Sequence, residues 1–130
     1  MQAMPDGWKV IDGILLKEVS TEVIVTLESF ADFELTLDWK LGPGGNSGLF
    51  YRGTEEYNRV YWSAVEYQLL DDSLARDGRN RITAAGAAHS LYPGARRCGA
   101  NFAKAKSGFI VIQRDHQGVL QLRNIKLRPR

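Results

Sequence analysis

The clearest pattern in the chain is a strict alternation of apolar and polar side chains from Phe33 to Lys40. Its odd-numbered residues are apolar, and its even-numbered residues are polar or charged. Because successive side chains of a strand point to opposite faces, this run predicts a strand with one face on a hydrophobic core. We expect its aromatic residues, Phe33 and Trp39, to lie in that core.

A second alternating run extends from Val65 to Leu70. Residues 65, 67 and 69 are apolar, whereas Glu66 and Gln68 lie between them. A strand with this spacing carries the two polar side chains on one face and the apolar ones on the other. The polar face is then either solvated or part of a binding site.

Turn residues divide much of the remaining chain into short runs that favour further strands. Asp12-Gly13 is a strong hairpin signal, and the stretch from Gly42 to Asn46 forces a turn because its proline cannot continue a ladder. The further predicted strands are Trp8 to Ile11, Ile14 to Leu16, Glu22 to Leu27, Gly48 to Arg52, Phe109 to Gln113 and Val119 to Leu127. The first two and the last two of these strands are expected to form hairpins.

The stretch from Asp71 to Lys106 breaks the pattern. Its first part is polar and rich in turn formers, and small residues without a clear period follow. We expect a long irregular excursion there, with a short helical turn between Leu74 and Arg81. Taken together, the patterns predict one all-β domain over residues 1–130.

Composition supports this fold class and removes several classes of partner. Thirteen glycines, five Phe, five Tyr and three Trp suit strands joined by tight turns. The formal net charge of +2 is too small to attract nucleic acid or anionic lipid, and no apolar stretch approaches the length of a membrane span. We therefore expect neither nucleic acid nor membrane as a partner.

The sequence leaves the cellular compartment open. Cys98 is the only cysteine, so the fold must hold without an intrachain disulfide. The first eight residues contain no charged region followed by an apolar run, so no signal peptide is predicted in this chain. The chain as written fits the cytoplasm, and it also fits an exported protein whose leader has been removed.

Four motifs are specific when taken in their order along the chain. They are Thr26 to Leu35 (TLESFADFEL), Gly45 to Arg52 (GNSGLFYR), Val65 to Asp72 (VEYQLLDD) and Leu122 to Leu127 (LRNIKL). With Trp8 and Asp12-Gly13 ahead of them, they resemble the 3-keto-disaccharide hydrolase family, also called domain of unknown function 1080. The resemblance implies a concanavalin A-like jelly-roll sandwich of two antiparallel sheets, with a sugar site on the concave sheet. It also implies cleavage of glycosides whose sugar has been oxidised to a 3-keto form.

The resemblance covers Trp8 to about Tyr92 and then Phe102 to Arg130, with a departure between. Family members continue after the first block through a Trp-Asn motif and a Leu-Asn-Gly turn, so we expect about three strands of roughly 5 to 6 residues each to be missing here. Such a gap exposes backbone groups and apolar surface. Either the excursion from Asp71 to Lys106 covers it or, as we favour, a second copy of the chain covers it in a homodimer.

Glu66 is the candidate acid or base for chemistry on a carbohydrate ligand, and Gln68 is a candidate donor and acceptor to sugar hydroxyls. Arg52 ends a predicted strand and is expected either to pair with Glu66 or bind vicinal hydroxyls, or only to fix strand register in a salt bridge. Asn46 shapes the preceding loop and is expected to face the ligand.

Three further residues are candidates with alternative roles. Asp71 is either a second carboxylate or a turn residue, and Trp62 either stacks on a sugar ring or packs in the core. His116 resembles a family position close to the site, and a histidine there suits proton transfer near neutral pH. No His-x-His or repeated Cys spacing occurs, so neither a metal nor another cofactor is predicted.

Two functions remain open at this point. An ordinary glycosidase needs two carboxylates roughly 5 to 10 Å apart, and only Glu66 is well placed. A 3-keto sugar relaxes this requirement because its ketone acidifies the neighbouring C–H, so one base can start an elimination and water can add afterwards. The chain is either such a hydrolase or lyase, with Glu66 as acid/base, or a non-catalytic carbohydrate-binding or interaction module that has lost part of the site.

Overall fold

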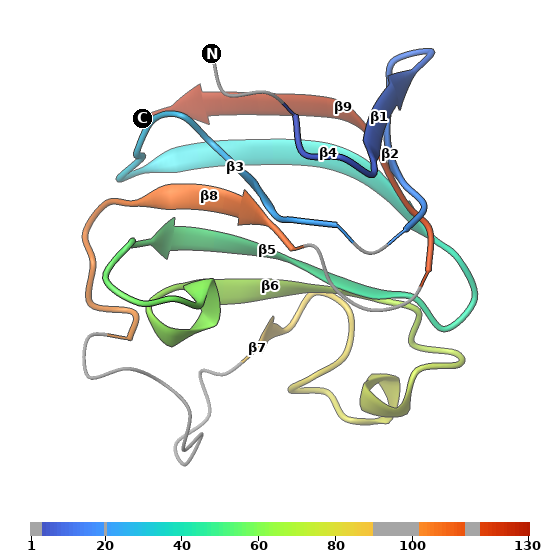
Figure 1. The fold of residues 1–130 in the computed structure, drawn as a ribbon. Coiled ribbons are helices and arrows are strands. Elements are labelled where there is room, and N and C mark those ends of the chain that lie inside the picture. The colour runs from blue at the N-terminus through green and yellow to red at the C-terminus, as the bar shows by residue number, and fades with distance from the viewer. Residues whose placement is uncertain (1–3, 20, 90–101, 114–117) are drawn as a thin grey trace.

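The computed structural model describes residues 4–19, 21–89, 102–113 and 118–130. Within them the secondary structure is almost entirely strands (Figure 1). The strands are β1 (Trp8–Ile11), β2 (Ile14–Lys17), β3 (Ile24–Val25), β4 (Phe33–Leu41), β5 (Asn46–Gly53), β6 (Val65–Leu70), β7 (Ala88–His89), β8 (Phe109–Ile112) and β9 (Leu120–Pro129). Two short 3₁₀ helices, η1 (Val60–Trp62) and η2 (Arg76–Arg79), lie between them.

The strands form two antiparallel sheets that pack as a sandwich. The four-stranded sheet has the order β1-β2-β9-β4, and the five-stranded sheet has the order β3-β8-β5-β6-β7. The predicted fold class, an all-β concanavalin A-like sandwich of two antiparallel sheets, is confirmed. The helical turn predicted between Leu74 and Arg81 is also present, as η2.

The two predicted hairpins have different outcomes. β1 and β2 form the first one, in which Asp12 and Gly13 adopt φ angles of 49° and 77° as a tight left-handed turn requires. The second hairpin is wrong, because β8 pairs with β3 and β5 while β9 pairs with β2 and β4. The connection after β8 therefore crosses from one sheet to the other. A run of alternating residues predicts a strand but not its neighbour.

The five-stranded sheet is covered by apolar side chains on both faces. Between the sheets, the buried core comprises Trp8, Leu49, Leu69, Leu120 and Leu122. A second buried cluster, comprising Phe50, Ala64 and Val111, lies on the other face of the same sheet. We call this second face the outer face, because it points away from the four-stranded sheet.

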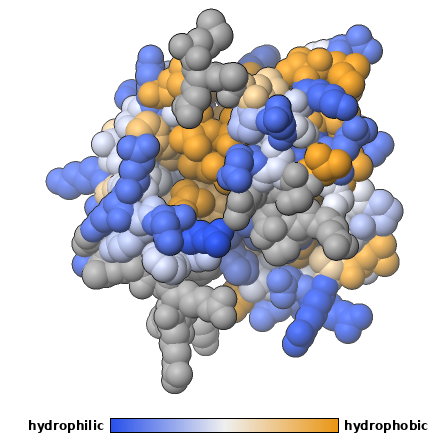
Figure 2. Space-filling view, viewed as in Figure 1, coloured by the Kyte–Doolittle hydropathy of each residue, from blue (hydrophilic) through white to orange (hydrophobic). Residues whose placement is uncertain are grey.

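The inner face of β4 is less covered than its sequence predicts. Phe33, Leu35 and Leu37 are half-buried, and Trp39 keeps 38% of its surface exposed. The expected core position of Trp39 is therefore wrong, although its face of the strand is right. Apolar side chains also reach the surface elsewhere, in the middle of the face shown in Figure 2 and near the β1–β2 hairpin, where Val10 and Ile11 are exposed.

Among the described residues, no helix has the length and apolar character needed to cross a membrane.

Candidate functional site

Glu66 lies on the outer face of the five-stranded sheet, directly above a glycine of the neighbouring strand. A Cβ atom placed on Gly48 would lie 2.2 Å from Oε1 of Glu66. Since real Cβ atoms do not approach an oxygen so closely, only glycine at position 48 leaves room for this carboxylate. The sequence motif around Gly48 therefore serves Glu66 directly, a relation that only the pairing of β5 with β6 reveals.

The polar side chains on this face are buried. Glu66 is 9% exposed and Gln68 is 3% exposed, so a solvated strand face, one of the two sequence interpretations, is wrong. Buried polar groups are stable only when they have hydrogen-bond partners, and Nε2 of Gln68 donates to Oδ1 of Asn46 over 2.7 Å. The structure thus brings Asn46, Gln68 and Glu66 together. Glu66 and Gln68 share a face as predicted, whereas Asn46, predicted in the preceding loop, is the first residue of β5.

His89 joins this group from β7, the edge strand next to β6. It pairs with Glu66 in register, and its Nδ1 lies 3.8 Å from Oε2 of the carboxylate. An imidazole beside a carboxylate can orient it or exchange a proton with it. Sequence reasoning missed this role, because His89 lies in the excursion where no periodicity indicates a strand.

Gln113 is a further residue of the outer face that the sequence did not single out. Its backbone N–H donates to the carbonyl of Gly48, so it lies across β5 from Gln68. Its side-chain Oε1 is buried and has no hydrogen-bond partner among the described residues. An unsatisfied buried acceptor costs free energy, and a sugar hydroxyl is a donor that can satisfy it.

Arg52 does not pair with Glu66, so this expectation is wrong. Between Phe50 and Gly53 the pairing of β5 with β8 shifts register, and Arg52 in this bulge adopts φ 56°. A bulge re-aims a side chain. Its Nη2 instead lies 3.3 Å from Oδ1 of Asp32. The site therefore lacks the arginine that the sequence placed beside the carboxylate.

Asp71 serves the loop that follows β6. Its carboxylate accepts hydrogen bonds from the backbone and hydroxyl of Ser73 and from the backbone N–H of Gly44. The Ser73 side chain, followed by the Gly44 N–H, holds the pKa of Asp71 below its usual value. The sequence left Asp71 as either a second carboxylate of the site or a turn residue, and these contacts are those of a turn residue.

Trp62 and His116 are the two remaining candidates. Trp62, in η1, is half-buried and packs edge-to-face against Tyr57 and Tyr61, with ring centroids 6.0 and 6.2 Å away. Whether it also stacks on a sugar stays a prediction. His116 lies outside the described residues. No three His, Cys, Asp or Glu side chains among the described residues lie close enough together to hold a metal ion.

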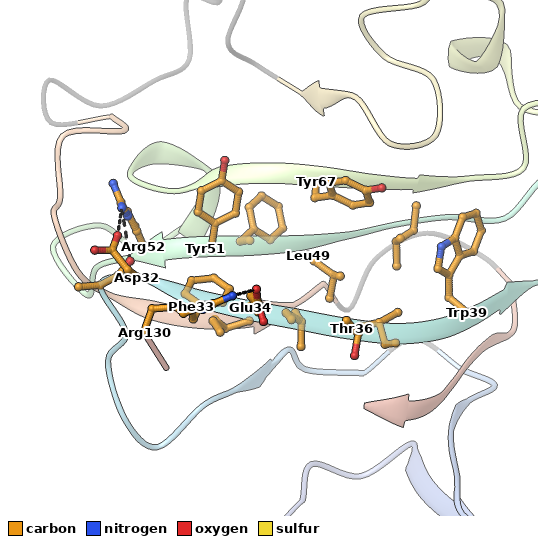
Figure 3. Close-up of a pocket in the computed structure, with 16 residues that line it drawn as sticks. Asp32, Phe33, Glu34, Thr36, Trp39, Leu49, Tyr51, Arg52, Tyr67 and Arg130 are labelled. Atoms are coloured by element: carbon orange, nitrogen blue, oxygen red, sulfur yellow. Dashed lines mark hydrogen bonds and ion pairs between the residues drawn. The ribbon is translucent and has the colours of Figure 1, made fainter. Parts of the chain in front are cut away.

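A groove opens on the other side of β5 and β6, between these strands and β4 (Figure 3). It encloses about 680 Å³ and is lined mainly by apolar side chains, including Trp39, Leu49 and Tyr67. Arg52 and Asp32 lie at one end of it. Because Glu66 and Gln68 point to the opposite face of the sheet, the groove and the polar group are separate features.

Comparison with known proteins gives one family. A family model described as the 3-keto-alpha-glucoside-1,2-lyase-like domain matches residues 2–93. A curated relative, the 3-keto-disaccharide hydrolase of Bacteroides thetaiotaomicron, is 28% identical over 95 residues, which cover 58% of this chain. The match spans only 33% of that relative's length.

Solved structures show the same fold at low sequence identity. Two proteins of Parabacteroides distasonis, provisionally assigned to the glycosyl hydrolases, superpose on this chain with TM-scores of 0.81 and 0.77. The first is 19% identical, with 96% of this chain and 84% of the other covered. The second is 22% identical, with 99% and 93% covered.

Proposed function

Since this chain belongs to the 3-keto-alpha-glucoside-1,2-lyase-like domain family, we propose that its outer face binds a 3-keto-glycoside and that Glu66 acts as the base that starts its cleavage. The observation that carries the proposal is the position of the Glu66 carboxylate. It is nearly buried, lies over Gly48 and has the imidazole of His89 within 3.8 Å.

One base is enough for this chemistry. The C3 ketone of the sugar acidifies the C2–H bond, and the ionised Glu66 carboxylate takes that proton while the electrons of the bond form an enolate. The enolate then expels the oxygen at C1, which takes the proton from Glu66 and leaves as an alcohol, so the carboxylate is restored and a C1–C2 double bond remains. Addition of water to that product gives net hydrolysis.

The neighbouring polar groups supply orientation. Asn46 accepts a hydrogen bond from Gln68 through its oxygen, so its amide nitrogen keeps its donors for a ligand. The side-chain carbonyl oxygen of Gln113, Oε1, supplies an acceptor on the other side of Gly48. His89 acts through Glu66, as a positioning residue that holds the carboxylate and exchanges its proton.

A second candidate function is carbohydrate binding without turnover. Two observations favour it: Arg52 pairs with Asp32 and not with Glu66, and the match spans a third of the curated hydrolase, 33%. In this case the same outer face binds the sugar, and Glu66 accepts hydrogen bonds from hydroxyl groups.

Turnover of a 3-keto-α-glucoside by the purified chain separates the two. The first function predicts turnover that falls by about 100-fold or more in Glu66→Gln, with binding by calorimetry kept, because general acid–base catalysis contributes ~10²–10⁴-fold. Glu28→Gln, at an exposed glutamate in the loop before β4, is the matched control and should behave as wild type. Binding without turnover in the wild type supports the second function. Turnover that survives Glu66→Gln, or absence of both binding and turnover, contradicts the proposal.

A further inference from the structure

β4 is the last strand of the four-stranded sheet. It pairs with β9 on one side, and among the described residues no strand pairs with its other edge. It has nine residues and so spans about 30 Å at ~3.4 Å per residue. It contains no proline, and the irregularity in its pairing comes from β9, where Asn124 adopts φ 53°. This edge lacks the prolines, bulges and short length that protect many edge strands, and its charged residues, Glu34, Asp38 and Lys40, restrict which strand can pair with it.

The inner face beside this edge is apolar and open. In the groove of Figure 3, Trp39 of β4 and Tyr67 of β6 are 38% and 47% exposed. The five-stranded sheet continues through β6 and β7, whereas the four-stranded sheet ends at β4. Among the described residues, no strand therefore lies opposite Tyr67. A strand added beside β4 would cover this apolar surface, which soluble domains normally keep buried.

We propose that β4 pairs antiparallel with β4 of a second copy of this chain, about a two-fold axis through Leu37, so that the two four-stranded sheets become one continuous sheet. In this register Glu34 faces Lys40 of the partner subunit, and Leu35 faces Trp39 of the partner subunit. The charged pair lies on the outer side of the sheet and the apolar pair on the groove side. A two-fold interface requires such self-complementarity.

The charges on β4 select this register over its neighbours. Opposed residues of a symmetric antiparallel pair must share a face, so alternative registers differ by two residues. A two-fold axis through Thr36 opposes Glu34 to Asp38, and an axis through Asp38 opposes that carboxylate to its own copy. Both place like charges directly opposite each other, which destabilises a sheet. The axis through Leu37 opposes Thr36 to Asp38 and avoids this.

The described part of the stretch from Asp71 to Lys106 does not cover the groove beside β4. Gly86 donates its backbone N–H to the carbonyl of Gln68, and β7 pairs with β6, so this segment extends the five-stranded sheet at its far edge. No described residue of the stretch from Asp71 to Lys106 lines the groove. The self-complementary pattern of β4 makes a second copy the occupant that fits, and this proposal is independent of the sugar site.

Two substitutions at Thr36 test the interface, because they are expected to change the dissociation constant of the dimer in opposite directions. Thr36 is exposed and faces Asp38 of the partner subunit twice per dimer, so neither variant disturbs the core. Sedimentation equilibrium of the wild type should show a dimer. Thr36→Asp should raise its dissociation constant about tenfold, and Thr36→Lys should lower it. A wild-type monomer at millimolar concentration, or equal effects of the two variants, overturns the proposal.

A symmetric cross-link tests the register itself. Leu37→Cys in a Cys98→Ser background places two thiols at the two-fold axis, where paired strands bring Cα atoms to about 4.5 to 5.5 Å. Mild oxidation should convert it to a covalent dimer. Leu35→Cys in the same background faces Trp39 of the partner subunit and should stay uncross-linked. Equal cross-linking of the two variants, or none of Leu37→Cys, contradicts the register.

Discussion

Two regions of the molecule, the outer face of the five-stranded sheet and the groove between the two sheets, depart from the usual distribution of side chains in opposite ways. On the outer face, Glu66 and Gln68 are buried at 9% and 3% exposure. In the groove, Trp39 of β4 and Tyr67 of β6 are exposed at 38% and 47%. Folding alone favours the opposite arrangement, with apolar groups inside and charged groups in water.

The contrast separates two kinds of function. Burying a carboxylate is costly, so one that lies beside an imidazole and above a glycine marks a candidate site for chemistry or for binding. Leaving aromatic surface open is costly in a different way, since it leaves apolar area in water that a partner can cover. The outer face is thus the candidate for a small ligand, and the β4 edge is the candidate for another chain.

The largest expected effect is on stability, and it compares a buried with an exposed residue of the inner face of β6. Leu69 is fully buried on the inner face of β6, whereas Tyr67 on the same face is 47% exposed. Leu69→Ala should lower the free energy of unfolding by about 2 to 5 kcal/mol because it leaves a cavity. Tyr67→Ala should cost only about 1 kcal/mol in the monomer. Urea denaturation at low protein concentration measures both, and equal costs would show that the groove is closed at Tyr67.

The next effect concerns the outer face. Gly48→Ala forces the Glu66 carboxylate out of its position and should cost about 1 to 3 kcal/mol of unfolding free energy, as overpacking typically does. Gly42→Ala is the matched control, because a Cβ there meets Val119 only at an ordinary 3.5 Å. The difference between the two variants in urea denaturation measures how tightly the face is packed. A Gly48→Ala protein as stable as Gly42→Ala would show that Glu66 is mobile.

The smallest effect is a pH dependence at the end of β6. Hydrogen bonds from the Ser73 side chain and the Gly44 N–H lower the pKa of Asp71 in the folded state. Its ionised form therefore stabilises the fold above the unfolded-state pKa of about 3.9, and this contribution is lost as pH falls through the lowered folded-state pKa. Asp71→Asn should melt below wild type at pH 7, with the difference closing in acid.

Asp77→Asn, at an exposed aspartate in η2, is the control for that measurement. It should follow the wild-type melting temperature at every pH. A difference between Asp71→Asn and wild type that persists unchanged in strong acid would show that the ionised carboxylate contributes nothing to the loop.

Alternation along the chain was enough to predict the strand that carries Glu66 and Gln68. It placed Glu66 and Gln68 on one face, and this is confirmed. It could not show what opposes a face, which is why Trp39 was assigned to a core that does not cover it. A period describes one strand, whereas burial depends on the strand or chain that packs against it.

The sequence did not predict features that depend on pairing between distant segments. Arg52 lies in a bulge that re-aims its side chain, and the run Gly48 to Arg52 carries no local signal for that backbone conformation. His89 reaches Glu66 only because two residues of an otherwise irregular segment add a strand to the sheet edge. Local residue patterns contain neither relation.

Nuclear magnetic resonance of the ¹⁵N-labelled chain, titrated with a 3-keto-α-glucoside, tests most directly which face binds sugar. If the outer face binds the sugar, the amide signals of Asn46, Gln68 and Gln113 will shift while the indole signal of Trp39 and the amide signal of Tyr67 stay in place. Shifts at Trp39 and Tyr67 with an unchanged outer face would contradict it.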